Sequence, residues 1–76
     1  MNSLKFYRLQ RDLTMKEMAE KIGISQSLYH YIEKGEANAS EEVAAKICEI
    51  LNVPKEGIFY PSKFRIYKLE EVDLIV

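Results

Sequence analysis

The sequence predicts an all-α fold of five helices followed by a C-terminal arm. The first observation is that apolar residues recur at three- and four-residue steps, the spacing of amphipathic helices. The second is that small polar residues and glycines stand where these stretches begin and end. The third is the composition, because 76 residues with 47% hydrophobic and 30% charged side chains are typical of one small globular domain. We therefore assign residues 1–60 to a helical domain and residues 61–76 to the arm.

The first helix is expected over residues 4–11. Asn2 or Ser3 supplies its N-cap, because either side chain can accept a hydrogen bond from a first-turn N–H group. Asp12 tolerates left-handed backbone geometry and ends the helix. The inward stripe of this helix is expected to consist of Leu4 and Tyr7, with the inclusion of Phe6 left open.

The second and third helices are expected over residues 15–22 and 26–33. Thr14 and Glu17 have the spacing of a capping box before the second helix, and Ser25 caps the third. A glycine follows each helix, where a left-handed residue is commonly needed. The residues predicted to face inward are Met15, Met18, Ala19, Ile22, Ile24, Tyr29 and Ile32.

The fourth helix is expected over residues 41–51, with Ser40 as its cap and Asn52 as its stop. A short fifth helix begins at Pro54, since proline is favoured at the first helical position, and ends at Pro61. The residues predicted to be buried are Val43, Ile47, Cys48 and Leu51 in the fourth helix and Ile58 and Phe59 in the fifth.

The last segment, SKFRIYKLEEVDLIV, is rich in aromatic and β-branched residues and ends in an apolar cluster. A short strand, a packed arm and a sixth helix all remain open for it. We expect this arm to mediate dimerisation, because its apolar side chains have little other use. The alternative is that it folds back on the first and fifth helices of its own chain. The predicted dimerisation residues are Phe64, Ile66, Leu69, Leu74, Ile75 and Val76.

Charge and side-chain inventory restrict the possible functions. The net charge is −1, but residues 1–34 carry six basic and four acidic side chains and residues 35–76 carry five and eight. A surface that faces a polyanion is therefore expected on the N-terminal half, with chance scatter as the alternative. One cysteine and one histidine cannot form a four-ligand zinc site or an internal disulfide. No nucleophile–base pair or phosphate loop is evident, so we expect no enzyme activity, metal, cofactor or small-molecule ligand.

Two further patterns concern location. Nothing in the first twenty residues resembles a signal peptide, because no long apolar run follows a basic start. No stretch approaches the roughly 20 apolar residues of a membrane span. We therefore expect a cytoplasmic protein with no membrane partner.

The strongest functional signal is the pair of helices joined across Gly23-Ile24-Ser25. Two helices with a tight glycine-containing turn form a helix-turn-helix, whose second helix can enter the major groove of DNA. Ala19 stands where a small residue lets the two helices cross closely, and Ile24 and Ile32 bracket the second helix. This register predicts double-stranded DNA as the partner.

At these positions the sequence resembles the Xre family of phage-repressor-like (Cro/CI-type) helix-turn-helix transcriptional regulators. The resemblance covers residues 4–59 and rests on the stretches LKFYRLQRDLTMKEMAEKIGIS, YIEKG and VAAKICEILNVPKEGIF. It implies a five-helix, lambda-repressor-like DNA-binding domain. It also implies a sequence-specific regulator, in particular a repressor that binds an inverted-repeat operator as a homodimer.

The resemblance implies roles for individual residues. Arg8 and Glu33 match a pair that bridges the first and third helices. Thr14 and Met15 match the start of the second helix, which lies on a DNA phosphate in the family. The matching groove-facing positions are Gln26, Ser27, Leu28, His30 and Tyr31, and the matching backbone-contacting loop positions are Lys34 and Asn38.

These residue types suit DNA chemically. Gln26 can pair with both hydrogen-bonding groups of an adenine edge, and Leu28 can pack on a thymine methyl. Helix starts present N–H groups that bind phosphate. The helix starts concerned are those capped by Thr14, Ser25 and Ser40, and the nearest cations are Lys16, Lys21 and Lys34. With so few cations, the salt dependence should be shallower than for a protein with 6–10 phosphate contacts.

Departures from the family pattern support a second hypothesis. Met15 stands where the family most often has glutamine, and Glu36 lies in a loop that is commonly basic. Leu28 and Tyr31 place apolar surface on the outward side of the third helix. These departures lower the expected DNA affinity. They favour, as the alternative, a protein-interaction module on the same fold, such as an antitoxin or an accessory regulator.

Overall fold

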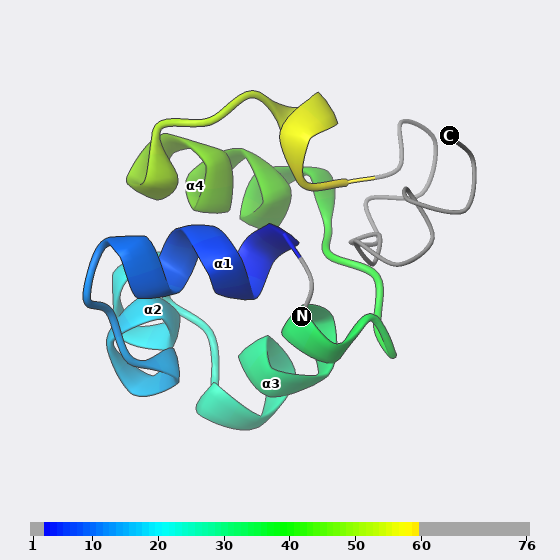
Figure 1. Ribbon diagram of the computed structural model, residues 1–76. Coiled ribbons are helices and arrows are strands. Elements are labelled where there is room, and N and C mark those ends of the chain that lie inside the picture. Colours follow the sequence, from blue (N-terminus) through cyan, green and yellow to red (C-terminus); the bar gives the residue numbers. More distant parts are fainter. Residues whose placement is uncertain (1–2, 60–76) are drawn as a thin grey trace.

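The computed structural model describes residues 3–59 of the chain. Figure 1 shows α1 running across the middle of the molecule, with α4 and the turn η1 on one side and α2 and α3 on the other. Helix α2 contacts both α3 and α4. The all-α prediction is therefore confirmed for this part of the chain, which contains α1 (Ser3–Gln10), α2 (Met15–Ile22), α3 (Gln26–Lys34), α4 (Glu41–Leu51) and the 3-10 helix η1 (Lys55–Gly57).

Side-chain caps set the starts of α2, α3 and α4, as predicted. The Glu17 N–H donates to the Thr14 hydroxyl at 3.0 Å, and the Thr14 N–H donates to the Glu17 carboxylate at 2.9 Å. The hydroxyls of Ser25 and Ser40 each accept an N–H from three residues later at 3.1 Å. These bonds satisfy N–H groups that a helix start otherwise leaves unpaired, so the boundaries follow from local sequence.

Left-handed residues follow all four helices, again as predicted. Gly23 has a φ of 91° and Gly35 a φ of 80°, a conformation that a residue without Cβ adopts at little cost. Asp12 and Asn52 both have a φ of 56°. Short side chains of this type tolerate the left-handed region because they can form local hydrogen bonds.

Two details of α1 that the sequence left open are its N-cap and the place of Phe6. Ser3 lies inside the first turn with 4% of its surface exposed, so it is not the N-cap; the alternative cap, Asn2, lies outside the described residues and stays a prediction. Leu4 is fully buried and Tyr7 partly buried, whereas Phe6 is 42% exposed. Phe6 follows Leu4 by two residues, about 200° around a helix, and therefore turns to the opposite side.

All four helices contribute to one apolar core. In α4 the predicted inward face needs one correction, because Ala44 is fully buried and Val43 only partly. Ala44 precedes Ile47 by three residues and Cys48 by four, so it shares their helical stripe. The core consists of Leu4, Met18, Ala19, Ile22, Tyr29, Ile32, Ala39, Ala44, Ile47, Cys48, Leu51, Ile58 and Phe59.

The predicted fifth helix is a single 3-10 turn, Lys55–Gly57, with Pro54 immediately before it. Gly57 has a low helix propensity, which disfavours continuation as an α-helix. Ile58 and Phe59 follow at once and are buried, as expected, with 0% and 1% of their surfaces exposed. The short turn thus returns the chain to the core beside α4.

The prediction of an arm over residues 61–76 lies outside the described residues, as do its possible strand and its dimerisation residues. No helix in the described range 3–59 is long and apolar enough to cross a membrane.

Candidate nucleic-acid interface

Helices α2 and α3 are joined by a turn that is stabilised by two backbone hydrogen bonds to the same carbonyl oxygen. The N–H groups of Gly23 and Ile24 both donate to the Ala19 oxygen, at 2.8 and 3.1 Å. Ala19 is 2% exposed and Ile24 packs against the core. The turn therefore holds α3 at a defined angle to α2, which is the geometry of a helix-turn-helix.

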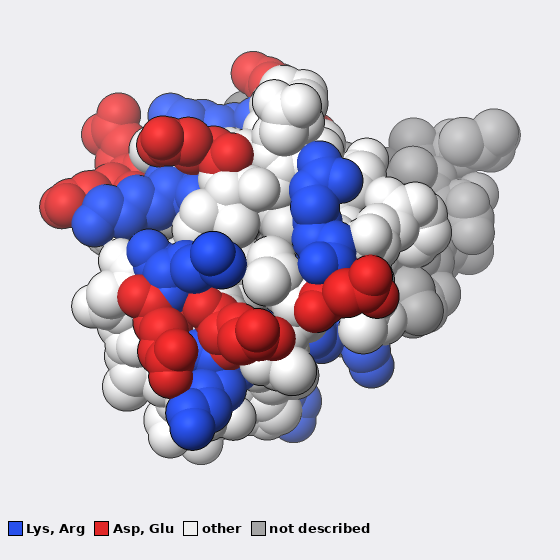
Figure 2. Space-filling view, turned by 90° about the vertical axis from the view of Figure 1, so that its left-hand side faces the viewer, with Lys and Arg blue, Asp and Glu red and all other residues white. Residues whose placement is uncertain are grey.

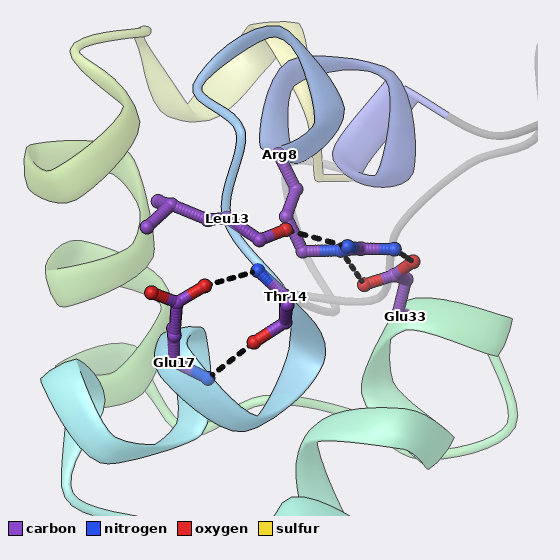
Figure 3. A network of polar contacts seen from close by, with 5 residues as sticks. All are labelled: Arg8, Leu13, Thr14, Glu17 and Glu33. Carbon is purple, nitrogen blue, oxygen red and sulfur yellow. Dashed lines mark hydrogen bonds and ion pairs between the residues drawn. The ribbon is translucent and has the colours of Figure 1, made fainter.

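A buried polar network, here called the bridge, connects α1, the start of α2 and α3 (Figure 3). The Arg8 guanidinium donates from Nε and Nη2 to the two carboxylate oxygens of Glu33, at 2.9 and 3.0 Å. Its Nη1 donates to the Leu13 carbonyl at 2.7 Å, directly before the capping box of α2. Arg8 and Glu33 are the pair that the family resemblance implied. The contact with Leu13 extends the bridge to the start of α2.

The bridge is held inside the protein. Arg8 and Glu33 are 5% and 2% exposed, and the hydrogen bonds to Glu33 raise the pKa of Arg8. The Tyr29 hydroxyl is buried and forms no hydrogen bond with the residues that the structure describes. Burial, followed by the negative charge of Glu33, raises the pKa of Tyr29. Arg8 therefore stays protonated and Tyr29 stays neutral at neutral pH.

The outer face of α3 has the opposite character. Leu28 and Tyr31 are 41% and 50% exposed, large values for apolar and aromatic side chains. The rings of His30 and Tyr31 contact each other edge to face, with centroids 5.8 Å apart. The outer face consists of the predicted groove-facing residues Gln26, Ser27, Leu28, His30 and Tyr31, and none of them is in the buried core.

The start of α2 lies beside this outer face. A hollow of about 370 Å³, open to solvent, is lined by Met15 of α2 and by Gln26, Ser27, His30 and Tyr31 of α3. Five predicted DNA-contacting residues are thus brought together. Leu28 of the outer face is not among the lining residues.

The capped helix starts are available to an anion. The Thr14 hydroxyl is engaged with the Glu17 N–H, and the Ser25 hydroxyl with the Leu28 N–H. The N–H groups of the first two residues of each helix remain directed out of the helix start. Oriented N–H groups at a helix start can bind an anion, and the starts of α2 and α3 both lie next to the hollow.

Within residues 3–59, the cations predicted to lie near the outer face are Lys16, Lys21 and Lys34. Lys16 is exposed on α2, whereas Lys34 forms an ion pair with Glu36 at 3.8 Å with both side chains about half exposed. Asn38 is exposed in the following loop. Figure 2 shows that basic and acidic side chains alternate on the side of the molecule that carries the turn between α1 and α2. That side of the molecule therefore carries mixed charge.

Several contacts had no signal in the sequence. Besides the Arg8–Leu13 bond, Arg11 donates to the Leu51 carbonyl at the end of α4. Lys46 donates to the Ile22 carbonyl at 3.4 Å and pairs with Glu42 at 3.6 Å. These bonds occupy two basic side chains with helix ends, away from the outer face of α3.

Comparison with known proteins matches this geometry. A family model described as helix-turn-helix matches residues 4–58. An uncharacterized HTH-type transcriptional regulator of Methanocaldococcus jannaschii is 40% identical over 58 residues, which cover 76% of this chain and 88% of the relative. An uncharacterized HTH-type transcriptional regulator of Archaeoglobus fulgidus is 32% identical over 56 residues, covering 74% of this chain and 79% of the relative.

A solved structure gives the same result for the fold. The crystal structure of the clp gene regulator ClgR from Corynebacterium glutamicum superposes with a TM-score of 0.66 at 26% identity. The match covers 71% of this chain and 57% of ClgR, so this chain corresponds to little more than half of that protein.

Proposed function

The chain belongs to the phage-repressor-like (Xre, Cro/CI-type) helix-turn-helix family, and from this premise we propose that it is a sequence-specific DNA-binding repressor that acts as a homodimer. The observation that carries the proposal is the exposed outer face of α3 beside the start of α2. A face of this kind is the part of a helix-turn-helix that enters the major groove.

Within this proposal, base recognition and phosphate binding are assigned to different groups. Gln26 contacts a base edge through its amide, and Ser27 and His30 add further hydrogen-bonding groups. The starts of α2 and α3 hold phosphates through N–H groups, assisted by Lys16 and by Lys34 in the following loop. Asn38 contacts the DNA backbone from the same loop. The remaining proposed contacts are Thr14, Met15, Ser25, Leu28 and Tyr31.

A homodimer follows from the small size of the reading surface. One helix of nine residues contacts only a few base pairs, whereas two copies on half-sites about 34 Å apart read a longer inverted repeat. We assign dimerisation to the arm, residues 61–76, because this segment is rich in apolar residues. Light scattering on the intact chain and on a chain ending at residue 60 tests this assignment. A dimer and a monomer are expected respectively, and a dimer in both would contradict it.

A second candidate is a protein-interaction module on the same fold. It is favoured by the apolar surface of Leu28 and Tyr31, which are 41% and 50% exposed, and by Glu36 beside Lys34. An exposed apolar patch on a helix face is a common site of protein binding. In this case the outer face of α3 binds another protein instead of DNA.

Selection of bound duplexes from a random DNA pool tests the two candidates together. The purified intact chain should enrich an inverted repeat, and fluorescence anisotropy over a salt series should show a shallow decrease in affinity. Enrichment of one sequence supports the repressor. No detectable binding even at low salt would contradict it and support the interaction module.

A further inference from the structure

The hollow beside α3 contains one residue that hydrogen-bonding readout does not explain. Four of its five lining residues carry hydrogen-bonding groups, namely Gln26, Ser27, His30 and Tyr31. The fifth is Met15, the first residue of α2, whose side chain ends in an apolar thioether. An apolar side chain in such a surface suits an apolar group on the ligand.

Met15 is also held in place. Its side chain is partly buried against the core, and the residue directly before it, Thr14, is fixed by the capping box. The bridge anchors the same segment through the bond from Arg8 to the Leu13 carbonyl. A side chain positioned in this way presents its exposed part to the hollow at a defined distance from α3.

We propose that Met15 is a specificity-determining residue that packs against the C5-methyl group of one thymine, next to the base pair that Gln26 contacts. This inference rests on the proposed DNA-binding function. The thymine methyl is the apolar group that the major groove presents, and apolar side chains recognise it by contact. The hollow is open to solvent, so it admits the projecting edge of a base; a site for a small molecule would enclose most of its ligand.

Leu28 is the competing candidate for such a contact, because it is apolar and 41% exposed. It does not line the hollow. On a helix that turns 100° per residue, Leu28 lies about 160° from His30 and therefore on the flank of the outer face. Met15, not Leu28, is thus adjacent to Gln26 and His30.

The test uses the duplex that the intact chain selects from a random DNA pool. Each thymine in turn is replaced by deoxyuridine, which removes the C5-methyl group and retains the hydrogen-bonding edge. One replacement should weaken binding by the wild type about four-fold, the effect of one buried methyl group. Met15→Ala should bind the thymine and deoxyuridine duplexes equally, whereas Leu28→Ala should retain the four-fold difference.

Two additions keep the test decisive. Met15→Gln preserves the side-chain length, so it replaces Met15→Ala if thermal melting shows that the alanine variant is unfolded, and it should also lose the difference. Leu9→Ala removes an exposed apolar side chain on α1, 46% exposed, and should behave as the wild type. Equal affinity of the wild type for the thymine duplex and every deoxyuridine duplex would overturn the inference. So would a difference in affinity that persists in the Met15 variants, or one that disappears in Leu28→Ala. Failure to select any duplex would instead overturn the proposed function.

Discussion

Helix α3 carries two polar regions that differ in nearly every physical respect, although His30 and Glu33 are only three residues apart. Glu33 is 2% exposed, accepts two hydrogen bonds from Arg8 and belongs to the bridge. The outer face contains no Lys, Arg, Asp or Glu and is largely solvent-exposed, with Tyr31 50% exposed. The polar groups of the bridge have their partners inside the chain, whereas those of the outer face are directed to solvent.

This difference separates folding from binding on a single helix. A buried charge that loses its partner strongly destabilises the fold, because inside the protein neither the partner nor water then compensates for the solvation that the charge has in the unfolded chain. Truncation of an exposed side chain changes the free energy of unfolding little, since water solvates the site before and after the change. Substitutions in the bridge should therefore reduce stability, and substitutions on the outer face should reduce binding while leaving stability unchanged.

The largest effect is expected from Arg8→Ala. The substitution leaves the Glu33 carboxylate buried without its partner and removes the donor to the Leu13 carbonyl. Breaking a buried ion pair from one side costs about 3–5 kcal/mol, a large part of the stability of a small domain. Urea denaturation followed by circular dichroism measures the loss.

Two variants sharpen this result. Arg11→Ala removes an arginine that is exposed and donates to one carbonyl, so its cost should be well below that of Arg8→Ala. Arg8→Met with Glu33→Leu replaces both charges by apolar side chains and should recover much of the stability. If Arg8→Ala unfolds at the same urea concentration as the wild type, the bridge does not stabilise the fold.

The second effect concerns the outer face. Gln26→Ala should weaken binding to the selected duplex by about 1–3 kcal/mol and relax specificity at one base pair. Its free energy of unfolding should stay within about 0.5 kcal/mol of the wild type, because the side chain is exposed. Anisotropy on single-base variants of the duplex measures the first quantity, and urea denaturation measures the second.

Gln10 provides the matched control, since it is an exposed glutamine on α1 rather than on α3. Gln10→Ala should change neither quantity. An equal loss of affinity by Gln26→Ala on every DNA sequence would argue against direct recognition of a base.

A third effect concerns charge beside the outer face. Glu36→Gln removes the carboxylate that lies 3.8 Å from the Lys34 ammonium, in a pair with both side chains about half exposed. Lys34 then becomes available to a phosphate, so the slope of log affinity against log salt should become steeper by about 0.9. Stability should change by less than about 1 kcal/mol, the usual range of an exposed pair.

Glu42→Gln is the corresponding control, because Glu42 pairs with Lys46 at 3.6 Å on α4. It should leave the salt slope unchanged. Identical slopes for the wild type and both variants would indicate that Lys34 does not contact DNA.

The features of the fold also differ in how well the sequence predicts them, and the helix ends are predicted best. The caps at Thr14, Ser25 and Ser40 and the left-handed ends at Gly23 and Gly35 were predicted correctly. Each depends on residues within one helical turn, so the local sequence contains the necessary information. The outer face was predicted as a set of positions, but its contacts with DNA remain a prediction.

Features that depend on how the helices pack were not predictable in the same way. The bond from Arg8 to the Leu13 carbonyl spans only five residues but requires the chain to turn back after α1, and the hollow beside Met15 exists only once α2 and α3 are packed together. No sequence pattern predicts them, because every residue has a carbonyl acceptor and the hollow is formed by residues of two different helices. The fifth helix was wrong in type, because Pro54 suggested a helix start but the structure has a single 3-10 turn, Lys55–Gly57.

The smallest effect is expected where the bridge and the outer face meet, at the capping box of α2. The hydrogen bond from the Thr14 N–H lowers the pKa of Glu17 below its ordinary value. A carboxylate whose pKa is lower in the folded state than in the unfolded state stabilises the fold at pH values above the unfolded pKa, which is about 4.3 for glutamate. This contribution should decline as the pH falls through that value towards the lower pKa of the folded state. Glu17→Gln retains the capping-box hydrogen bonds but does not titrate, so the stability advantage of the wild type over it should shrink between pH 6 and pH 3.

Urea denaturation at several pH values measures this difference, and Glu20→Gln serves as the control on the same helix, because its side chain is exposed and outside the capping box. Glu20→Gln leaves the capping-box hydrogen bonds of Thr14 and Glu17 in place, so it shows the effect of removing a carboxylate elsewhere on α2. A pH-independent difference between the wild type and Glu17→Gln would mean that the charge of Glu17 contributes nothing to the start of α2. The capping box would then position Met15 and the adjacent N–H groups through neutral hydrogen bonds alone, and DNA binding through that helix start should be equally insensitive to the titration of Glu17.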